Sequence, residues 1–205
     1  MPLPPLLYCA TSNPGKLAEF RVAAPPGLHI VPAGLFDCPE TGRTFEENAV
    51  QKALCYAAHV GAAVFADDSG LEVDSLGGEP GVHSARYAGP QATDEQNRAL
   101  LLENLRRRSL SGTRSAARFV CVLALAQPQR LLATFHGVAE GVILDAPRGE
   151  GGFGYDPLFY FPPLGATFAE ISSEQKLLHS HRGKAFRALL EWLRRTGLPA
   201  FPSGR

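Results

Sequence analysis

The sequence predicts an α/β protein with a mixed β-sheet, and three observations lead to this fold class. Apolar segments with strand character alternate with segments of helical periodicity over the first third of the 205 residues. Two long apolar segments then follow one another in the middle of the chain, as paired strands do. Hydrophobic residues make up 45% and charged residues 20%, which is close to the average for globular proteins and excludes a disordered chain.

Capping residues and helix-ending residues delimit the predicted elements of the first half. Asn13 and Thr44 are suited to cap two helices, and Pro25 and Gly61 are suited to end them. Thr44 also forms a capping box with Glu47. The expected elements are a strand over 6–10, a helix over 15–24, a strand over 29–31, a helix over 44–60 and a strand over 62–66.

The second half predicts paired strands followed by helices. The glycine- and proline-rich residues 74–92 predict a loop, after which Thr93 and Gln96 form another capping box. The last helix carries its apolar residues on one face, and Gly197 stands at its expected C-terminus. The expected elements are a helix over 93–108, strands over 118–126 and 131–138 that 142–144 extends, a loop over 145–157, a strand over 158–161, and helices over 173–179 and 181–195.

Charge and cysteine usage limit the possible partners and location. Lysine plus arginine and aspartate plus glutamate both number 20, so no overall field favours nucleic acid or a membrane surface. The longest apolar run, 119–126, is too short to span a bilayer, and the N-terminal segment lacks the basic region of a signal peptide. The four cysteines lack metal-ligand spacing, and Cys9 and Cys121 lie in apolar runs. We expect a reducing, cytoplasmic location.

Two segments are placed where a phosphate or a metal would bind. Thr11-Ser-Asn-Pro-Gly-Lys16 joins a strand to a helix, where backbone N–H groups attract anions and Lys16 adds charge. The alternative is an ordinary Asn-capped turn with a surface lysine. Asp67-Asp68-Ser69-Gly70 follows an apolar strand, and adjacent carboxylates there suit Mg²⁺. The alternative is a solvated turn, because these residue types are common in turns.

Three further segments carry candidate ligand-binding residues. Lys52 neighbours the apolar face of its helix, so it points into a cleft or is a snorkelling surface lysine. Gly149-Glu-Gly-Gly-Phe-Gly154 matches G-x-G-x-x-G only formally, because Pro157 forbids the following helix. This loop presents Phe153 to stack on a flat ring, or anchors it in the core. His181 and Arg182 open the last helix as donors for a phosphate or a base, or as an exposed basic turn.

Taken together, these segments supply the parts of a nucleoside triphosphate site. They contain cations for phosphates, carboxylates for a metal, an aromatic ring for stacking and donors for a base edge. A magnesium-assisted hydrolase needs this set, since the metal activates water and neutralises charge on the phosphate oxygens.

The chain also resembles the inosine triphosphate pyrophosphatase family, from about residue 7 to residue 193. Seven motifs in the order and spacing of that family carry the resemblance. They are Thr11-Ser-Asn-Pro-Gly-Lys16, Glu40-Thr-Gly, Phe45-Glu-Glu-Asn-Ala49 with Lys52-Ala53, Ala66-Asp-Asp-Ser-Gly-Leu71, Gly77-Gly with Pro80-Gly and Ser84-Ala-Arg-Tyr87, Gly151-Gly-Phe-Gly-Tyr-Asp-Pro157, and Ser180-His-Arg-Gly-Lys184.

The resemblance implies a fold and a reaction. The fold would be a single domain over residues 1–205, an elongated ITPase-like (Maf-Ham-like) sheet flanked by helices, with two lobes around a cleft and a homodimeric assembly. The reaction would be Mg²⁺-dependent hydrolysis of ITP, dITP or XTP to the monophosphate and pyrophosphate, which removes deaminated purines from the nucleotide pool.

The resemblance also implies residue roles. Asp68 and Lys52 would be catalytic, with Asp68 as the general base, and Glu40 and Asp68 would bind Mg²⁺. Lys52 and Lys176 would contact phosphates, and His181 and Arg182 would read the base. The substrate-binding residues would be Thr11, Ser12, Asn13, Pro14, Gly15, Lys16, Ser69, Phe153, Gly154, Tyr155, Asp156, Lys176, His181 and Arg182.

Two alternatives and one departure from the family pattern accompany this reading. The chain could be a nucleotide sensor without turnover, or a pyrophosphatase for another modified or pyrimidine triphosphate. Donors aimed at position 6 of a purine would accept hypoxanthine or xanthine and leave buried groups unpaired against adenine. After Lys176 the family often has a small polar residue, whereas this chain has Leu177-Leu178-His179 beside the expected base pocket.

Overall fold

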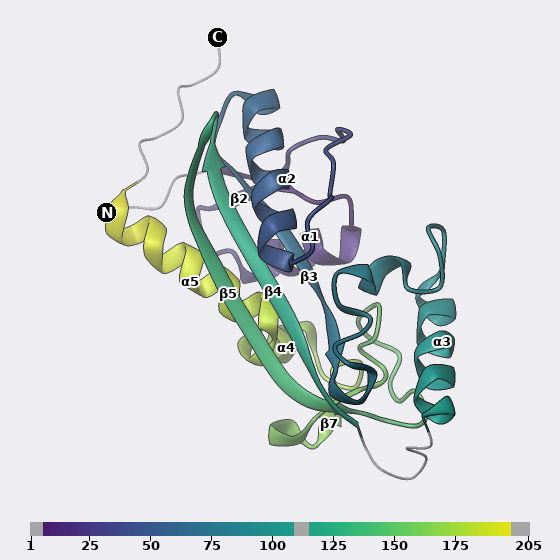
Figure 1. Ribbon diagram of the computed structural model, residues 1–205. Coiled ribbons are helices and arrows are strands. Elements are labelled where there is room, and N and C mark those ends of the chain that lie inside the picture. Colours follow the sequence, from purple (N-terminus) through teal and green to yellow (C-terminus); the bar gives the residue numbers. More distant parts are fainter. Residues whose placement is uncertain (1–5, 109–114, 198–205) are drawn as a thin grey trace. The chain divides into compact units, whose positions relative to one another are not determined.

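The computed structural model describes residues 6–108 and 115–197 and confirms the predicted fold class. Its sheet has seven strands in the order β2-β1-β3-β4-β5-β6-β7, with helices packed on it (Figure 1). The strands are β1 (Leu6–Ala10), β2 (His29–Pro32), β3 (Val64–Val73), β4 (Ser115–Gln127), β5 (Arg130–Ile143), β6 (Phe159–Phe161) and β7 (Ala166–Thr167). The α-helices are α1 (Pro14–Ala23), α2 (Phe45–Val60), α3 (Asp94–Arg107), α4 (Ser173–His179) and α5 (His181–Thr196).

The described residues fall into two compact units. Unit 1 is drawn from the chain up to Asp68, from Cys121–Gly137 and from Arg182 onward, and unit 2 is drawn from Ser69–Val120 and Val138–His181. Strands β3, β4 and β5 therefore contribute residues to both units. Each unit has a hydrophobic core of its own.

Unit 1 is built on parallel strands with helices on both sides. Strand β1 pairs in parallel with β2 and with β3, as expected where helices connect the strands. Helix α2 lies in front of the strands and α5 behind them (Figure 1). The predicted apolar face of α5 is confirmed, because Phe186, Leu189, Leu190 and Leu193 are all buried in this core. The ring of Phe186 packs against those of Phe20 and Phe65.

Unit 2 contains antiparallel strands and a core rich in phenylalanine. Strand β6 pairs in antiparallel fashion with both β5 and β7. The rings of Phe119, Phe159 and Phe168 contact one another in the core. Helix α3 begins with the predicted capping box, in which Thr93 and Gln96 each bind the backbone of the other.

Strand β3 corrects the sequence prediction, which ended it at residue 66. It runs to Val73, so Asp67-Asp68-Ser69-Gly70 lies inside a strand and is not a turn. The physical reason is burial: Leu71 and Val73 are buried in the core of unit 2, and the backbone N–H of Leu71 donates to the Ser84 hydroxyl. The predicted loop over 74–92 also contains two short 3₁₀ helices, Asp74–Leu76 and Gly81–Arg86.

Two of the four cysteines form a disulfide that the sequence analysis did not foresee. Cys38 and Cys55 are bonded, whereas Cys9 and Cys121 are free and buried. A disulfide is uncommon in the reducing location that we expected. Among the described helices, none is long and apolar enough to cross a membrane.

Candidate active site

Asp67 is the centre of a buried ion network in unit 1. Its carboxylate pairs with the Lys16 ammonium group and accepts from Arg182 Nε at 3.3 Å and from Cys121 Sγ at 3.1 Å. Arg182 in turn pairs with Glu19. Burial would raise the pKa of Asp67, but the charges of Lys16 and Arg182 outweigh burial and hold it well below its usual range. Asp67 is therefore a permanently charged and fully engaged carboxylate.

The loop before α1 places Lys16 in this network. The Asn13 side chain accepts from the backbone N–H of Lys16 at 3.0 Å and caps the helix, as the sequence predicts. The Thr11 hydroxyl accepts from the backbone N–H of Asn13 at 3.2 Å. Lys16 is thus directed toward Asp67, and the interpretation as a surface lysine is wrong.

Asp68, the next residue, has a different environment. It is 8% exposed, and its carboxylate accepts a hydrogen bond from the Asn48 side chain of α2. Its buried Oδ2 has no hydrogen-bond partner among the described residues. Burial raises the pKa of Asp68 to about 6, although the charges of Lys16 and Lys52 act in the opposite direction. A carboxylate with this pKa can accept a proton near neutral pH.

Lys52 connects Asp68 with the predicted metal ligand Glu40. Lys52 Nζ lies 2.7 Å from Glu40 Oε1 and donates to the backbone carbonyl of Asp67 at 3.1 Å. Burial lowers the pKa of Lys52, but Glu40 outweighs burial and Asp68 adds to its effect, so this pKa lies above its usual value. The lysine is therefore a charged group that both carboxylates face, not a snorkelling surface residue.

The segment that carries Glu40 is tied to α2 at several points. The backbone N–H of Gly42 donates to Asn48 Oδ1 at 2.8 Å, and that of Thr41 donates to Gln51 Oε1 at 3.2 Å. The disulfide joins Cys38 of this segment to Cys55 of α2. These bonds hold Glu40 against the helix that carries Lys52.

The donor set of Glu40 and Asp68 fits a hard cation. Within residues 6–108 and 115–197, no three His, Cys, Asp or Glu side chains lie together as an all-protein metal site requires. Mg²⁺ is commonly held by one or two carboxylates together with water and substrate phosphates. The buried Oδ2 of Asp68, which lacks a hydrogen-bond partner in the described structure, is available to coordinate such a cation.

Unit 2 gathers a second group of predicted residues around the glycine-rich loop. Lys176 is buried and pairs with Asp156 at 2.5 Å, and its Nζ lies 4.7 Å from the centre of the Phe153 ring. Asp156 also accepts from the backbone N–H of Phe153 at 2.9 Å. Lys176, Asp156 and Phe153 thus form one cluster.

The other predicted residues have separate surroundings. Tyr155 is buried in the core of unit 2 and donates from its hydroxyl to the Ser84 carbonyl. The His181 ring is buried and stacks on Phe119, with centroids 4.7 Å apart. Ser69 lies in β3 and is partly exposed. Arg182 is buried as well, so the alternative interpretation of 181–182 as an exposed basic turn is wrong.

Sequence reasoning missed several residues that complete these clusters. Glu19 pairs with Arg182, Cys121 donates a hydrogen bond to Asp67, and Asn48 donates one to Asp68. Asn48 falls inside the Phe45–Ala49 motif, which is the one signal that pointed to it. Glu19 and Arg182 are 163 residues apart, so no local pattern joins them.

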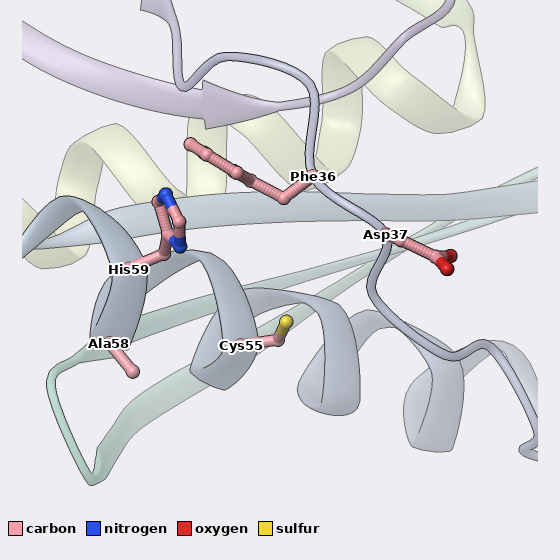
Figure 2. Close-up of a pocket in the computed structure, with 5 residues that line it drawn as sticks. All are labelled: Phe36, Asp37, Cys55, Ala58 and His59. Atoms are coloured by element: carbon pink, nitrogen blue, oxygen red, sulfur yellow. The ribbon is translucent and has the colours of Figure 1, made fainter.

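A further hollow in unit 1 does not involve the predicted residues. It has a volume of about 480 Å³ and is lined by Phe36, Asp37, Cys55, Ala58 and His59. Figure 2 shows the rings of Phe36 and His59 facing each other, with Asp37 pointing away from them. None of the candidate catalytic or substrate-binding residues lines this hollow.

Known proteins resemble this chain over most of its length. A model of the Ham1 family matches residues 7–192. A curated dITP/XTP pyrophosphatase of Thermus thermophilus is 54% identical over 186 residues, covering 89% of this chain and 88% of that protein. One of an Exiguobacterium species is 51% identical, covering 89% of this chain and 94% of that protein.

Solved structures of similar proteins show the same fold. The structure of the Staphylococcus aureus Ham1 protein has a TM-score of 0.81 and 43% identity, covering 93% of this chain and 98% of that one. A HAM1 protein from Coxiella burnetii has a TM-score of 0.83 and 39% identity, covering 93% and 99%.

Proposed function

The chain belongs to the Ham1 family, and we propose that it hydrolyses non-standard purine nucleoside triphosphates to the monophosphate and pyrophosphate. Similarity to dITP/XTP pyrophosphatases over nearly nine-tenths of the chain supports the substrate class. The observation that carries the reaction is Asp68, a buried carboxylate with a raised pKa beside Lys16 and Lys52. Asp68 would act as the general base, and the neighbouring cations would bind phosphates.

Lys16 and Lys52 would bind the triphosphate together with Thr11, Ser12, Asn13, Pro14 and Gly15. Asp68 would take a proton from water as the water oxygen bonds to the α-phosphorus. The bond from the α-phosphorus to the bridging oxygen then breaks, and pyrophosphate leaves with that oxygen. Positioned cations lower the barrier because negative charge spreads over the phosphate oxygens in the transition state.

Glu40 and Asp68 would hold Mg²⁺, the cofactor that we propose. When bound, such a metal neutralises phosphate charge and makes water a stronger nucleophile. Glu40 is paired with Lys52 at 2.7 Å, so a cation that would bind phosphates lies beside the carboxylate that would hold the metal.

The cluster of unit 2 would bind the base and sugar. Phe153 would stack on the purine, and Gly154, Tyr155 and Asp156 would help to hold the base and sugar. Lys176 would contact a phosphate, Ser69 would contact the substrate, and His181 and Arg182 would read the base. Donors facing position 6 would pair with the keto oxygen of hypoxanthine or xanthine, and the amino group of adenine would oppose them.

We also propose a single catalytic domain over the whole chain, a homodimeric assembly and a cytoplasmic location. The last agrees with a substrate drawn from the nucleotide pool, and no described helix could span a membrane.

A turnover panel tests the proposed function. The protein is incubated with about a dozen nucleoside triphosphates with and without Mg²⁺, and the released phosphates are identified. We expect pyrophosphate from ITP, dITP and XTP only when Mg²⁺ is present, with ATP and GTP poor substrates. Orthophosphate as the product, equal turnover of ATP, or ITP binding without turnover would refute the proposal.

A further inference from the structure

Two side chains of α3 bind the backbone N–H and the backbone carbonyl of Gly154. Asp94 accepts from the backbone N–H of Gly154 at 2.6 Å, and Arg98 Nη1 donates to the Gly154 carbonyl at 2.6 Å. Asp94 and Arg98 are four residues apart on α3, so they lie on one face of the helix. Both bonds are charge-assisted, which makes them stronger than neutral hydrogen bonds.

The loop that they hold depends on glycine. Gly152 and Gly154 have φ values of 69° and 60°, in the left-handed region that other residues avoid. A Cβ on Gly152 would clash with the Asp156 carboxylate. A glycine-rich segment has many accessible conformations, so outside contacts must select the one that presents Phe153.

The hydrogen bonds from Asp94 and Arg98 to Gly154 lie toward the surface of unit 2 and not in its core. Asp94 is exposed and Arg98 and Gly154 are half-buried, whereas the next residue, Tyr155, is already fixed in the core of unit 2. Phe153, on the other side of Gly154, meets Lys176 and donates from its backbone to Asp156. Loss of these hydrogen bonds would therefore increase the mobility of the loop at Phe153 more than at Tyr155.

We propose that Asp94 and Arg98 are positioning residues that set the place of Phe153 and thereby the affinity for the purine ring. This inference rests on the proposed function, in which Phe153 stacks on the base. It assigns no chemical step to either residue. The groups that would take part in the reaction belong to unit 1. We therefore expect kcat to depend little on the hydrogen bonds from Asp94 and Arg98.

Kinetics of matched variants test this inference. Asp94→Ala and Arg98→Ala are each expected to raise KM for ITP about tenfold, the effect of losing one hydrogen bond to a charged group, with kcat within about twofold of wild type. Asp94→Asn keeps an acceptor and is expected to restore most of the affinity. Glu95→Ala removes a charge from the same helix turn, leaves Asp94 in place, and is expected to leave KM unchanged.

Two further measurements separate positioning from general damage. Inhibition by pyrophosphate, which needs no base stacking, is expected to be equal in wild type and in the two alanine variants. In a Phe153→Ala background, Asp94→Ala is expected to have little further effect on KM, because the ring that it positions is gone. An unchanged KM, an equal rise with Glu95→Ala, or a matching loss of pyrophosphate inhibition would overturn the inference.

Failure of the proposed function gives a different result. Wild-type protein that does not hydrolyse ITP would refute the function alone. Calorimetric binding of ITP to the same variants would then decide the inference, which predicts about tenfold weaker binding for both alanine variants.

Discussion

The two faces of β3 differ sharply at Asp67 and Asp68. These neighbours point to opposite sides of the sheet, because side chains alternate along a strand. Asp67 meets Lys16, Arg182 and Cys121, and its pKa is held low. Asp68 meets Asn48 of α2 and keeps one buried oxygen without a partner in the described structure, and its pKa is raised to about 6.

This difference shows how surroundings divide the work between two chemically identical groups. A carboxylate surrounded by cations and donors stays ionised and holds structure together, whereas one with an open oxygen and a raised pKa can bind a metal or take a proton. We therefore expect Asp67 to stabilise the fold, and we propose Asp68 as the residue that takes part in the reaction.

Removing the charge of Asp67 is expected to have the largest effect on stability. Asp67→Asn leaves Lys16 and Arg182 facing a neutral group in a buried site, which should cost about 3–5 kcal/mol of unfolding free energy. Urea unfolding monitored by circular dichroism measures this loss. A cost below about 1 kcal/mol would show that Asp67 is not the structural member of the pair.

Reduction of the disulfide is expected to loosen the segment that carries Glu40 on the Asp68 side. The bond closes a loop across a sequence separation of 17, so its loss should cost about 3 kcal/mol of unfolding free energy. Urea unfolding with and without dithiothreitol measures the effect. Cys38→Ser should not respond to dithiothreitol, and an equal response from that variant would place the effect elsewhere.

The raised pKa of Asp68 predicts that the unfolding free energy falls as pH rises and this group becomes charged. A group whose pKa is higher in the folded state stabilises the fold below its unfolded pKa, and this contribution is lost as pH rises through the folded value. Between pH about 4 and about 6, wild type should lose about 2–3 kcal/mol that Asp68→Asn does not lose. Unfolding of both proteins in EDTA from pH 4 to pH 8 measures this difference. Parallel pH curves for the two proteins would contradict the assignment.

The thiol bound to Asp67 is expected to have the smallest effect. Cys121→Ala removes the Sγ donor to Asp67, and Cys9→Ala removes an equal volume from the same core. The first variant should be less stable than the second by about 1 kcal/mol, the value of one hydrogen bond. Equal stabilities would mean that the thiol only fills space.

Local sequence signals predicted most of the helices and strands, and the charged motifs together predicted a nucleoside triphosphate site. Asn13, Thr44 and Thr93 cap helices as expected, because capping depends on residues only three apart. The end of β3 was missed because Leu71 and Val73 are buried in the core of unit 2, which residues far away in the sequence complete. The Glu19–Arg182 pair and the Cys38–Cys55 bond are likewise tertiary contacts without a local signal.

The residues of Asp67-Asp68 alone predicted two carboxylates suited to a metal, and only the family resemblance singled out Asp68. Their difference depends on burial and on partners from α1, α2, β4 and α5, which only the folded chain brings together. The same holds for Arg182, which was expected to read a base and pairs in unit 1 with Asp67 and Glu19.

Turnover by Asp68→Asn tests the central claim most directly. At saturating ITP and Mg²⁺, and with unfolding stability shown to be retained, this account predicts that pyrophosphate release falls about 10²–10⁴-fold. A variant that releases pyrophosphate at nearly the wild-type rate would contradict it, because the proton would then have another acceptor.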